Sequence, residues 1–425
     1  MALLIFAGSL LLSMFIGLPI AFSLIICALS LIYFLDMTDI QIITQNMWNG
    51  ANNFPLLAVP FFMLAGEFMN AGGMTKRIIG IAMTWVGHVR GGMGYVAVFA
   101  AIIMASLSGS AAADTAALAA ILLPMMREAG YKLNRTGGLI GAGGIIAPVI
   151  PPSVAMILYG VTGQISITKL FLAGIVPGII MGIGLLLTWR LLAKSENVQT
   201  SPKSTLRERL KKTREGFWAL LLPVIIIGGL RIGIFTPTEA AVIAAAYSLF
   251  VGVFIYRGIN LGSLYGLMLN AAKTTAVIMF LVAAASVSAW LIAAADIPAQ
   301  LTELLAPVMY NQTLLILTLM LLIFIIGTAM DLTPTILVMT PVLVPLIKQA
   351  GIDPVYFGVL FVINTSIGLI TPPVGTVLNV ICGIGKISMD ELVKGILPFL
   401  LTCVVILILL VLFPQLVLFP LALMT

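Results

Sequence analysis

The stretch GGIIAPVIPPSV, residues Gly143–Val154, places two adjacent prolines, Pro151 and Pro152, inside a long apolar run. Proline has no amide hydrogen to donate within a helix, and it moves the residue before it away from helical geometry. A membrane-crossing helix must therefore break here. The break leaves free carbonyl groups at the end of one half-helix and free amides at the start of the next, which favours a cation site beside an anion site.

A second stretch of the same kind lies in the other half of the chain. NTSIGLITPPVG (Asn364–Gly375) contains the proline pair Pro372-Pro373. The segments LLPMMREAG (Leu122–Gly130) and LVPLIKQAG (Leu343–Gly351) align at the same separation along the chain as the two proline pairs. Repeats of this kind, each rich in apolar segments, are typical of duplicated transporter halves. If each half has an odd number of crossings, we expect the second half to be inverted.

The composition indicates a protein whose main solvent is lipid. Of 425 residues, 61% are apolar and 8% are charged, so a water-soluble domain would lack a surface able to stay dispersed. Apolar runs long enough for a membrane-crossing helix recur along the chain. We therefore expect an all-α polytopic membrane protein with about ten to twelve embedded segments. Residues 1–35 are predicted to form one long tilted helix or two short helices around Gly17-Leu18-Pro19.

One long polar stretch, Lys194–Arg214, separates the two halves. Eight of the 21 basic residues lie between Arg190 and Arg214. Lys and Arg near helix ends are retained on the cytoplasmic side, so the net charge of +6 is interpreted as a topology signal, and no nucleic-acid partner is expected. The sequence predicts a first repeat at residues 1–193, a basic cytoplasmic linker at 194–216 and a second repeat at 217–425.

Each half has one isolated carboxylate inside an apolar region. Asp114 and Asp331 lie in the small, polar stretches ASLSGSAAADT (Ala105–Thr115) and GTAMDLTPT (Gly327–Thr335). Charged residues are expensive in lipid and are functional candidates there. The preceding apolar runs are too short to cross the bilayer, so each stretch is predicted to be the tip of a re-entrant hairpin. We expect hairpins near residues 92–127 and 312–348, and broken helices near 136–163 and 355–385.

The hydroxyl groups of these tips lie in sequence near the expected helix breaks. Ser106, Ser108, Ser110 and Thr115 accompany the break at 143–148, and Thr328, Asp331 and Thr333 accompany the break at 364–371. Exposed carbonyls and hydroxyls at broken helices are the ligands that membrane transporters offer to sodium. The sequence predicts one sodium site in each half, with the substrate between the two tips.

Other interpretations of these residues stay open at this point. Small residues in membrane helices often only allow close packing, and Asp114 and Asp331 could be helix N-caps. Thr236-Pro237-Thr238-Glu239 fits a capping box, which gives Glu239 a structural role. An enzyme is not expected, because the chain has neither a Walker A nor a His-Glu-x-x-His motif, and no histidine follows Ser108 to act as its base.

Six motifs, in order and over nearly the whole chain, resemble the large membrane subunit of the tripartite ATP-independent periplasmic (TRAP) transporters. They are NNFPLLAVPFFMLAGEFMNAGG (Asn52–Gly73), ASLSGSAAADTAA (Ala105–Ala117), GGIIAPVIPPS (Gly143–Ser153), GIFTPTEAA (Gly233–Ala241), MDLTPTILVMTPVLVP (Met330–Pro345) and GLITPPVG (Gly368–Gly375). The resemblance implies an elevator-type transporter of the bacterial inner membrane, with a scaffold, a mobile domain and two sodium sites. It also implies two partners, a small four-helix membrane subunit and a periplasmic solute-binding protein.

The resemblance also implies residues for each site. The candidate sodium ligands are Ser106, Ser108, Gly143, Gly144 and Pro148 in the first half, and Gly327, Thr328, Asp331, Asn364, Thr365, Ser366 and Thr371 in the second. The candidate substrate residues are Ser108, Ser110, Asp114, Pro151, Ser153, Asp331, Thr333 and Thr376.

Within that family the sequence is most similar to permeases for keto-sugar acids such as 2,3-diketo-gulonate, so we expect sodium-coupled import of an organic acid anion. Neither polar core contains Arg or Lys, so recognition of an anion would depend on half-helix N-termini, hydroxyls and bound sodium. The alternative is a self-sufficient sodium–dicarboxylate symporter of related architecture, which would transport without partners. A purely structural scaffold would show no sodium dependence.

Overall fold

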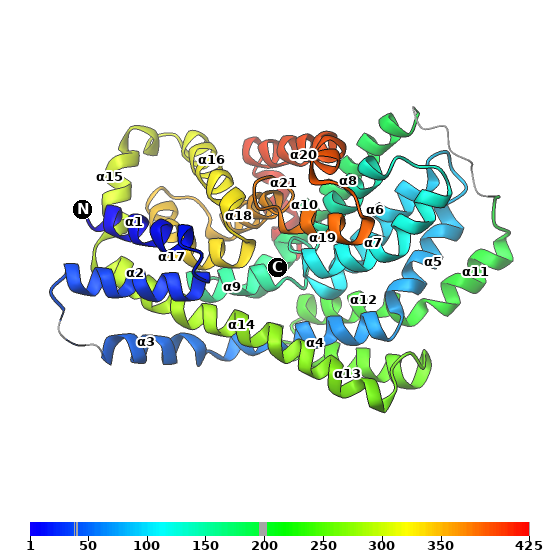
Figure 1. The fold of residues 1–425 in the computed structure, drawn as a ribbon, viewed down its shortest axis with the longest axis horizontal. Helices are drawn as coiled ribbons and strands as arrows, with labels where there is room; N and C mark the ends of the chain where they lie inside the picture. Colours follow the sequence, from blue (N-terminus) through cyan, green and yellow to red (C-terminus); the bar gives the residue numbers. More distant parts are fainter. Residues whose placement is uncertain (38, 40, 195–201, 425) are drawn as a thin grey trace.

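The computed structural model describes residues 1–425 except 38, 40, 195–201 and 425, and every regular element within these residues is a helix (Figure 1). This confirms the all-α fold class. The helices are α1 (Ala2–Phe15), α2 (Ile20–Phe34), α3 (Gln41–Ala51), η1 (Phe54–Leu57), α4 (Ala58–Ala71), α5 (Met74–Val86), α6 (Gly92–Ser108), α7 (Ala111–Glu128), α8 (Leu133–Gly144), α9 (Val154–Gly163), α10 (Ile167–Ala193), α11 (Leu206–Glu215), α12 (Phe217–Ile232), α13 (Pro237–Phe250), η2 (Val251–Ile255), α14 (Leu261–Ala294), α15 (Ile297–Met309), α16 (Gln312–Ala329), α17 (Leu332–Gln349), α18 (Pro354–Gly368), α19 (Thr376–Gly385), α20 (Met389–Leu412) and α21 (Gln415–Met424).

Many of these helices have the length and composition of membrane spans. Within the described residues, seven are long and apolar enough to cross a bilayer, or up to eight if the bent pair α11 and α12 counts as one span. Seven further apolar helices have only 10–17 residues. A helix of that length covers less than the ~30 Å of a hydrocarbon core. Four of the seven, α6, α9, α18 and α19, belong to the expected hairpins and broken helices, whereas α16 and α17 of the second expected hairpin are long enough to cross.

The N-terminal apolar region forms two short helices, α1 and α2, which turn back on each other around Gly17. The Ser9 hydroxyl donates to the Cys27 sulfur at 3.2 Å, which fixes the pair in an antiparallel arrangement. Of the two possibilities that the sequence left open, the structure therefore has the pair of short helices. Cys27, Cys382 and Cys403 are all free.

Helix boundaries recur along the chain at a constant spacing. The ends of α6 and α16, at Ser108 and Ala329, are separated by the same length of chain as Pro151 and Pro372. The starts of α7 and α17 share this spacing, and so do the starts of α8 and α18, whereas the spacing between the starts of α9 and α19 is longer by a single position. The periodicity read from sequence motifs is therefore present in the positions of the helix ends.

Both proline pairs lie between helices. α8 ends at Gly144 and α9 starts at Val154, with Pro151-Pro152 in the intervening turns. In the second half, α18 ends at Gly368 and α19 starts at Thr376 after Pro372-Pro373. Each hairpin also has a turn between its two helices. In the first hairpin, Gly109 and Ser110 separate α6 from α7, and Gly109 has a left-handed φ of 64°. In the second, α16 ends at Ala329 and α17 starts at Leu332.

Helices of the first half pack directly against helices of the second half. α7 of the first half packs against α19 of the second, and α17 of the second packs against α9 of the first (Figure 1). The Arg127 guanidinium donates to the Gly385 carbonyl at 2.7 Å, and the Tyr159 hydroxyl donates to the Pro354 carbonyl at 2.9 Å. The hairpins and broken helices thus form one interlocked unit.

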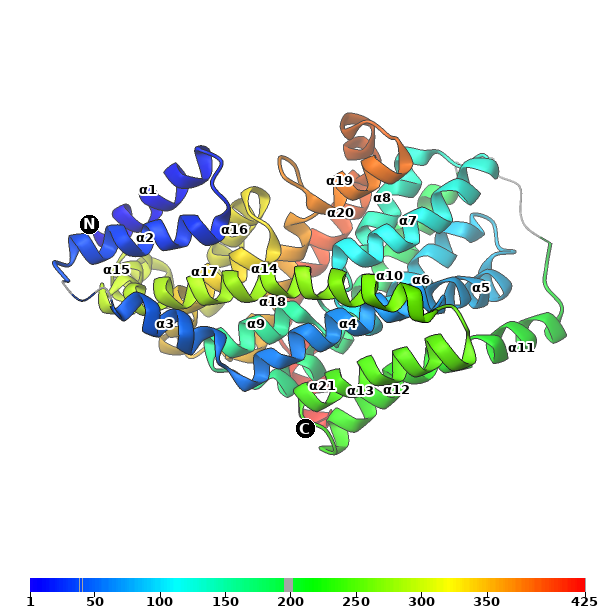
Figure 2. The same ribbon diagram turned by 60° about the horizontal axis from the view of Figure 1, so that its bottom comes forward.

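The long helix α14 runs across this unit on one side, next to α3 and α4 (Figure 2). α13 packs on α4, and α12 and α11 continue the same side of the molecule. α13 begins with the expected capping box, in which Thr236 N donates to Glu239 Oε2 at 2.8 Å and Glu239 N donates to Thr236 Oγ1 at 3.3 Å. The structural role of Glu239 is therefore confirmed.

Candidate functional site

The tips of both hairpins and both helix breaks meet at one cavity of about 140 Å³. Its wall includes the first residue of four helices: Ala111 of α7, Val154 of α9, Leu332 of α17 and Thr376 of α19. The start of a helix carries unpaired amides and a partial positive charge. Four helix N-termini around one cavity favour the binding of an anion.

Polar side chains reach this cavity from both hairpin tips. Ser110 belongs to the first tip, Asp331 and Thr333 belong to the second, and Thr376 follows the second break. Four of the eight predicted substrate residues therefore line the cavity. The other four, which are Ser108, Asp114, Pro151 and Ser153, are not part of its wall.

The first hairpin tip holds a buried chain of hydrogen bonds. Ser110 is the N-cap of α7 and its hydroxyl accepts from Ala113 N at 3.4 Å, so Asp114 is not the cap but lies in the first turn. The Ser110 amide donates to Ser108 Oγ at 3.1 Å, and Ser108 Oγ donates to Asp114 Oδ1 at 2.5 Å. Ser108 thus connects the N-cap residue to the buried carboxylate.

Two buried oxygens behind this tip have no hydrogen-bond partner among the described residues. They are Oδ2 of Asp114 and Oγ1 of Thr115, and both side chains are at most 1% exposed. The last residue of α8, Gly144, lies in close contact with α7. A β-carbon added to Gly144 would overlap the Thr115 hydroxyl and lie 3.3 Å from the Ala111 carbonyl oxygen. The absence of a side chain at Gly144 therefore allows the end of α8 to lie directly beside these unpaired oxygen atoms.

Asp331, at the second hairpin tip, has different hydrogen-bond partners from those of Asp114. Asp331 has the backbone position of an N-cap for α17, but its carboxylate makes no capping hydrogen bond. It accepts instead from the Thr376 hydroxyl at 3.0 Å. The carboxylate is therefore shared between the tip of the hairpin and the start of α19, at the wall of the cavity.

The break in the first half is held by Ser153. Its hydroxyl donates to the Pro148 carbonyl at 2.5 Å and accepts from Met156 N at 3.2 Å, which makes it the N-cap of α9. Ser153 is fully buried, whereas Pro148 lines the cavity. Ser153 therefore shapes the wall without being part of it.

In the second half, Asn364 is the buried polar group that lacks a partner. Its Nδ2 donates to the Met320 carbonyl at 2.6 Å, and Oδ1 has no partner within the described chain. α16 and α18 approach closely nearby, because a β-carbon on Gly368 would lie 2.8 Å from the Gly327 carbonyl carbon. This close contact of two helix ends resembles the arrangement at Gly144.

The hydroxyl groups among the remaining predicted ion ligands donate to backbone carbonyls three or four residues earlier in the chain. They are Ser106 to Ile103, Thr328 to Ile325, Thr365 to Phe361, Ser366 to Val362 and Thr371 to Ile367. A hydroxyl that donates one hydrogen bond keeps its lone pairs for another donor or a cation. Gly143 packs with its α-carbon toward Ala101, where an added β-carbon would lie 3.0 Å from the Ala101 β-carbon.

Three residues of the cavity wall come from helices that the sequence analysis did not connect with the site. Met63 comes from α4, and Thr274 and Ile278 come from α14. The two α14 residues are four positions apart and so share one face of the helix. Lys273-Thr274-Thr275 is a polar interruption of a long apolar run, and this interruption is the signal that could have drawn attention to α14.

Comparison with known proteins identifies the family. Residues 7–416 match the family described as "Tripartite ATP-independent periplasmic transporter, DctM component". The chain belongs to this family. It is therefore a permease subunit and not an enzyme, and it is a multi-pass protein of the bacterial inner membrane.

Two relatives illustrate the range of this DctM family. The 2,3-diketo-L-gulonate TRAP transporter large permease protein YiaN of Escherichia coli is 55% identical over 421 residues, covering 99% of both chains. The sialic acid TRAP transporter large permease protein SiaM of Vibrio cholerae is 39% identical and covers 95% of this chain and 94% of its own. Among solved structures, the YdaH transporter of Alcanivorax borkumensis aligns with a TM-score of 0.64 over 89% of this chain and 88% of that chain. Its sequence identity of 16% means that the likeness concerns the fold alone.

Proposed function

We propose that this DctM-family permease imports an organic acid anion, of the keto-sugar acid class, by coupling its entry to that of sodium. The observation that carries the proposal is the cavity whose wall contains the first residues of four helices together with Asp331. Relatives named for 2,3-diketo-L-gulonate and sialic acid support the substrate class, because both compounds are organic acids.

The carboxylate in the cavity wall supports the proposed coupling to a cation. Two like charges about 4 Å apart repel by roughly 4 kcal/mol at an effective dielectric constant near 20, which corresponds to a loss of roughly a thousandfold in affinity. Asp331 would therefore oppose an anionic substrate in the cavity until a sodium ion neutralises it. Binding of the anion then depends on prior binding of the cation, which is the thermodynamic basis of coupled transport.

Each of the two proposed sodium sites would include a buried oxygen that lacks a hydrogen-bond partner among the described residues. The first would use Asp114 Oδ2, Thr115 Oγ1 and the carbonyls at the end of α8, and the second would use Asp331, Asn364 Oδ1 and the carbonyls at the ends of α16 and α18. A buried oxygen without a partner costs about 1–3 kcal/mol. A bound cation would remove this cost, because it satisfies the lone pairs.

The recurring helix ends support two duplicated halves, inverted with respect to each other. We propose that the hairpins and broken helices move together as the transport domain, while α3, α4, α13 and α14 form the scaffold. The cavity lies between these two groups, since Met63 and Thr274 come from the scaffold and the helix N-termini come from the moving unit. Movement of one unit against the other would expose the same cavity to each side in turn, as in an elevator mechanism.

The proposed partners are a small four-helix membrane subunit and a periplasmic solute-binding protein, in keeping with the tripartite family. The test is uptake of labelled 2,3-diketo-L-gulonate and sialic acid into proteoliposomes. We expect uptake to require an inward sodium gradient and both partner proteins. Sodium-independent uptake would overturn the coupling, and uptake by this chain alone would identify it as a self-sufficient sodium–dicarboxylate type of symporter.

A further inference from the structure

Another polar cavity, of about 440 Å³, lies where α5, α11, α12 and the end of η2 meet. Its wall includes Arg77, Lys211, Arg214, Glu215, Trp218 and Tyr256. None of these residues belongs to a hairpin or a broken helix, so the transport mechanism leaves this cavity unexplained. It lies at the basic linker that the distribution of charge assigns to the cytoplasmic side.

Helix α11 has the form of a helix that lies in the membrane surface. It departs from the direction of α12 by 58°, after a start fixed by a capping box between Thr205 and Glu208. Leu206 and Leu210 are four residues apart and are 68% and 58% exposed, so they form an apolar stripe that the protein does not cover. An amphipathic helix with a basic polar face typically buries such a stripe at the boundary of the lipid headgroups.

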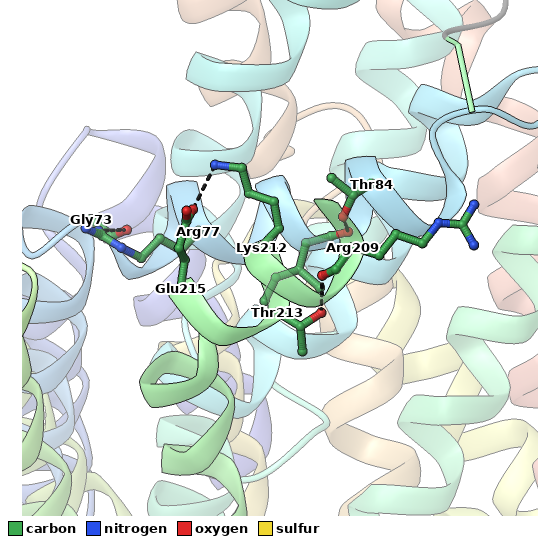
Figure 3. A network of polar contacts seen from close by, with 8 residues as sticks. Gly73, Arg77, Thr84, Arg209, Lys212, Thr213 and Glu215 are labelled. Carbon is green, nitrogen blue, oxygen red and sulfur yellow. Dashed lines mark hydrogen bonds and ion pairs between the residues drawn. The ribbon is translucent and has the colours of Figure 1, made fainter. Parts of the chain in front are cut away.

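α11 is held on α5 (Figure 3). Trp85 Nε1 donates to Thr213 Oγ1 at 3.1 Å, and the Arg209 guanidinium lies over the Trp85 ring at 5.6 Å from its centre. These contacts fix the rotation of α11 about its axis. Lys211 and Arg214 are three residues apart and therefore reach the cavity together.

Arg77 is positioned independently of α11. Its Nη1 donates to the Gly73 carbonyl at 3.0 Å, and its guanidinium lies 3.7 Å from the centre of the Tyr256 ring. The Tyr256 hydroxyl in turn accepts from the Ala219 amide at 3.2 Å, which anchors the ring to the start of α12. The Arg77 cation is therefore preorganised at the cavity.

The charges of the cavity wall do not balance. Arg77, Lys211 and Arg214 face one acid, Glu215, and this acid already forms an ion pair at 2.8 Å with Lys212, which lies outside the wall. In Figure 3, Lys212 and Glu215 are joined by this contact, with Arg77 close to Glu215. The surplus of positive charge favours an anionic ligand, and phosphate oxygens suit guanidinium and ammonium donors.

We propose that this cavity binds the phosphate headgroup of an anionic phospholipid in the cytoplasmic leaflet. Basic pockets and basic amphipathic helices on that side of a membrane protein are suited to such lipids. The exposed apolar stripe of α11 and the exposed Phe217 ring favour a lipid over free phosphate, because they offer a surface for acyl chains. Trp218 and Tyr256 are aromatic residues of the type that lies at the headgroup level. A lipid held here would fix α5, α11 and α12 in the membrane, whichever ion or anion the protein transports.

The test uses the purified full-length chain in detergent, titrated with dioctanoyl phosphatidylglycerol or dioctanoyl phosphatidylcholine and observed by native mass spectrometry. We expect tighter binding of phosphatidylglycerol. The variant Lys211→Gln/Arg214→Gln removes two exposed cations from the cavity wall, and it should weaken phosphatidylglycerol binding by about tenfold or more, since each basic residue near an anionic lipid contributes roughly fivefold. The matched control Lys203→Gln/Arg207→Gln removes the same charge from the linker and α11 outside the cavity, and it should bind as the wild type does.

Three results would overturn the proposal. Equal affinity for the two lipids would show that the headgroup charge is not recognised. An equal loss in the control variant would show a general effect of charge and no specific site. Displacement of phosphatidylglycerol by an equal concentration of inorganic phosphate or glycerol phosphate would identify the ligand as a soluble phosphate. Melting temperatures of both variants, measured in parallel, should match that of the wild type because none of the four side chains is buried.

Discussion

The Thr376 hydroxyl donates a hydrogen bond to the Asp331 carboxylate, with 3.0 Å between Oγ1 and Oδ1. Asp331 stands at the tip of the second hairpin and Thr376 is the first residue of the helix that follows the second break. The bond therefore joins the two kinds of irregular backbone at the wall of the same cavity. It also sets the direction of the one carboxylate that borders that cavity among the described residues.

Replacing Thr376 by valine should weaken sodium-dependent uptake. The change keeps the shape of the side chain but removes a hydrogen bond to a charged group, which contributes about 1.5–3 kcal/mol. We expect the sodium concentration for half-maximal uptake to rise by about tenfold or more. Thr376→Ser retains the hydroxyl and should behave nearly as the wild type. If the valine variant retained the wild-type sodium dependence, the hydroxyl would have no part in positioning Asp331.

Replacing Asp331 by asparagine should make the binding of the anion independent of the sodium concentration. The side chain keeps its size and loses its charge, so the repulsion of an anionic substrate disappears together with a proposed sodium ligand. If Asp331 is a sodium ligand as proposed, sodium-driven uptake should fall to background, and binding of the anion to the purified protein should no longer increase with sodium. Circular dichroism and the melting temperature would show whether the variant is folded.

A variant at Asp331 that kept the normal response to sodium would remove this residue from the ion site. Asp353→Asn is the matched control for the loss of one carboxylate. Asp353 caps α18 through Val355 N and Tyr356 N at 2.8 Å, away from the cavity wall. It should lower the melting temperature slightly, because it removes a negative charge from the N-terminus of α18, and leave the dependence on sodium unchanged.

Replacing Ser108 by alanine should disable the first ion site. The change removes the donor to Asp114 Oδ1 and leaves a fully buried carboxylate with no partner among its described neighbours, at a cost of about 1–3 kcal/mol. We expect sodium-coupled uptake to be lost while the protein remains folded. Ser30→Ala is the matched control, since the Ser30 hydroxyl donates only to Ile26 of its own exposed helix face. Normal transport by the Ser108 variant would exclude this serine from the mechanism.

The local features of the site could be predicted from the sequence because proline and glycine act on the backbone next to them. Pro151-Pro152 and Pro372-Pro373 each lie between two helices, and the small polar stretch around Gly109 contains the turn between α6 and α7. The N-cap of α7 was not identified from the sequence, which offered Asp114 as a possible cap. The register of α7 decides in favour of Ser110 and leaves Ser108 to bind Asp114.

Contacts between distant segments could not be predicted in the same way. Met63 and Thr274 reach the cavity only because α4 and α14 pack across the hairpin unit, and no local pattern specifies that packing. The pairing of α7 with α19 and of α17 with α9 has the same origin. Single-sequence patterns predict where helices begin and end, but the faces that meet depend on the packing of the whole domain.

Replacing Gly144 by alanine tests whether the end of α8 forms an ion site with α7. The added β-carbon would occupy the space of the Thr115 hydroxyl and press on the Ala111 carbonyl, so it should push α8 away from the unpaired oxygens of Asp114 and Thr115. Overpacking of this kind costs about 1–3 kcal/mol. We expect a lower melting temperature and a loss of sodium-dependent uptake that high sodium concentrations restore only in part. Gly228→Ala, in α12, meets no atom within 4 Å and should change neither property. Should Gly144→Ala lower the melting temperature but keep the wild-type response to sodium, the glycine would serve helix packing alone and the first sodium ion would have to bind elsewhere.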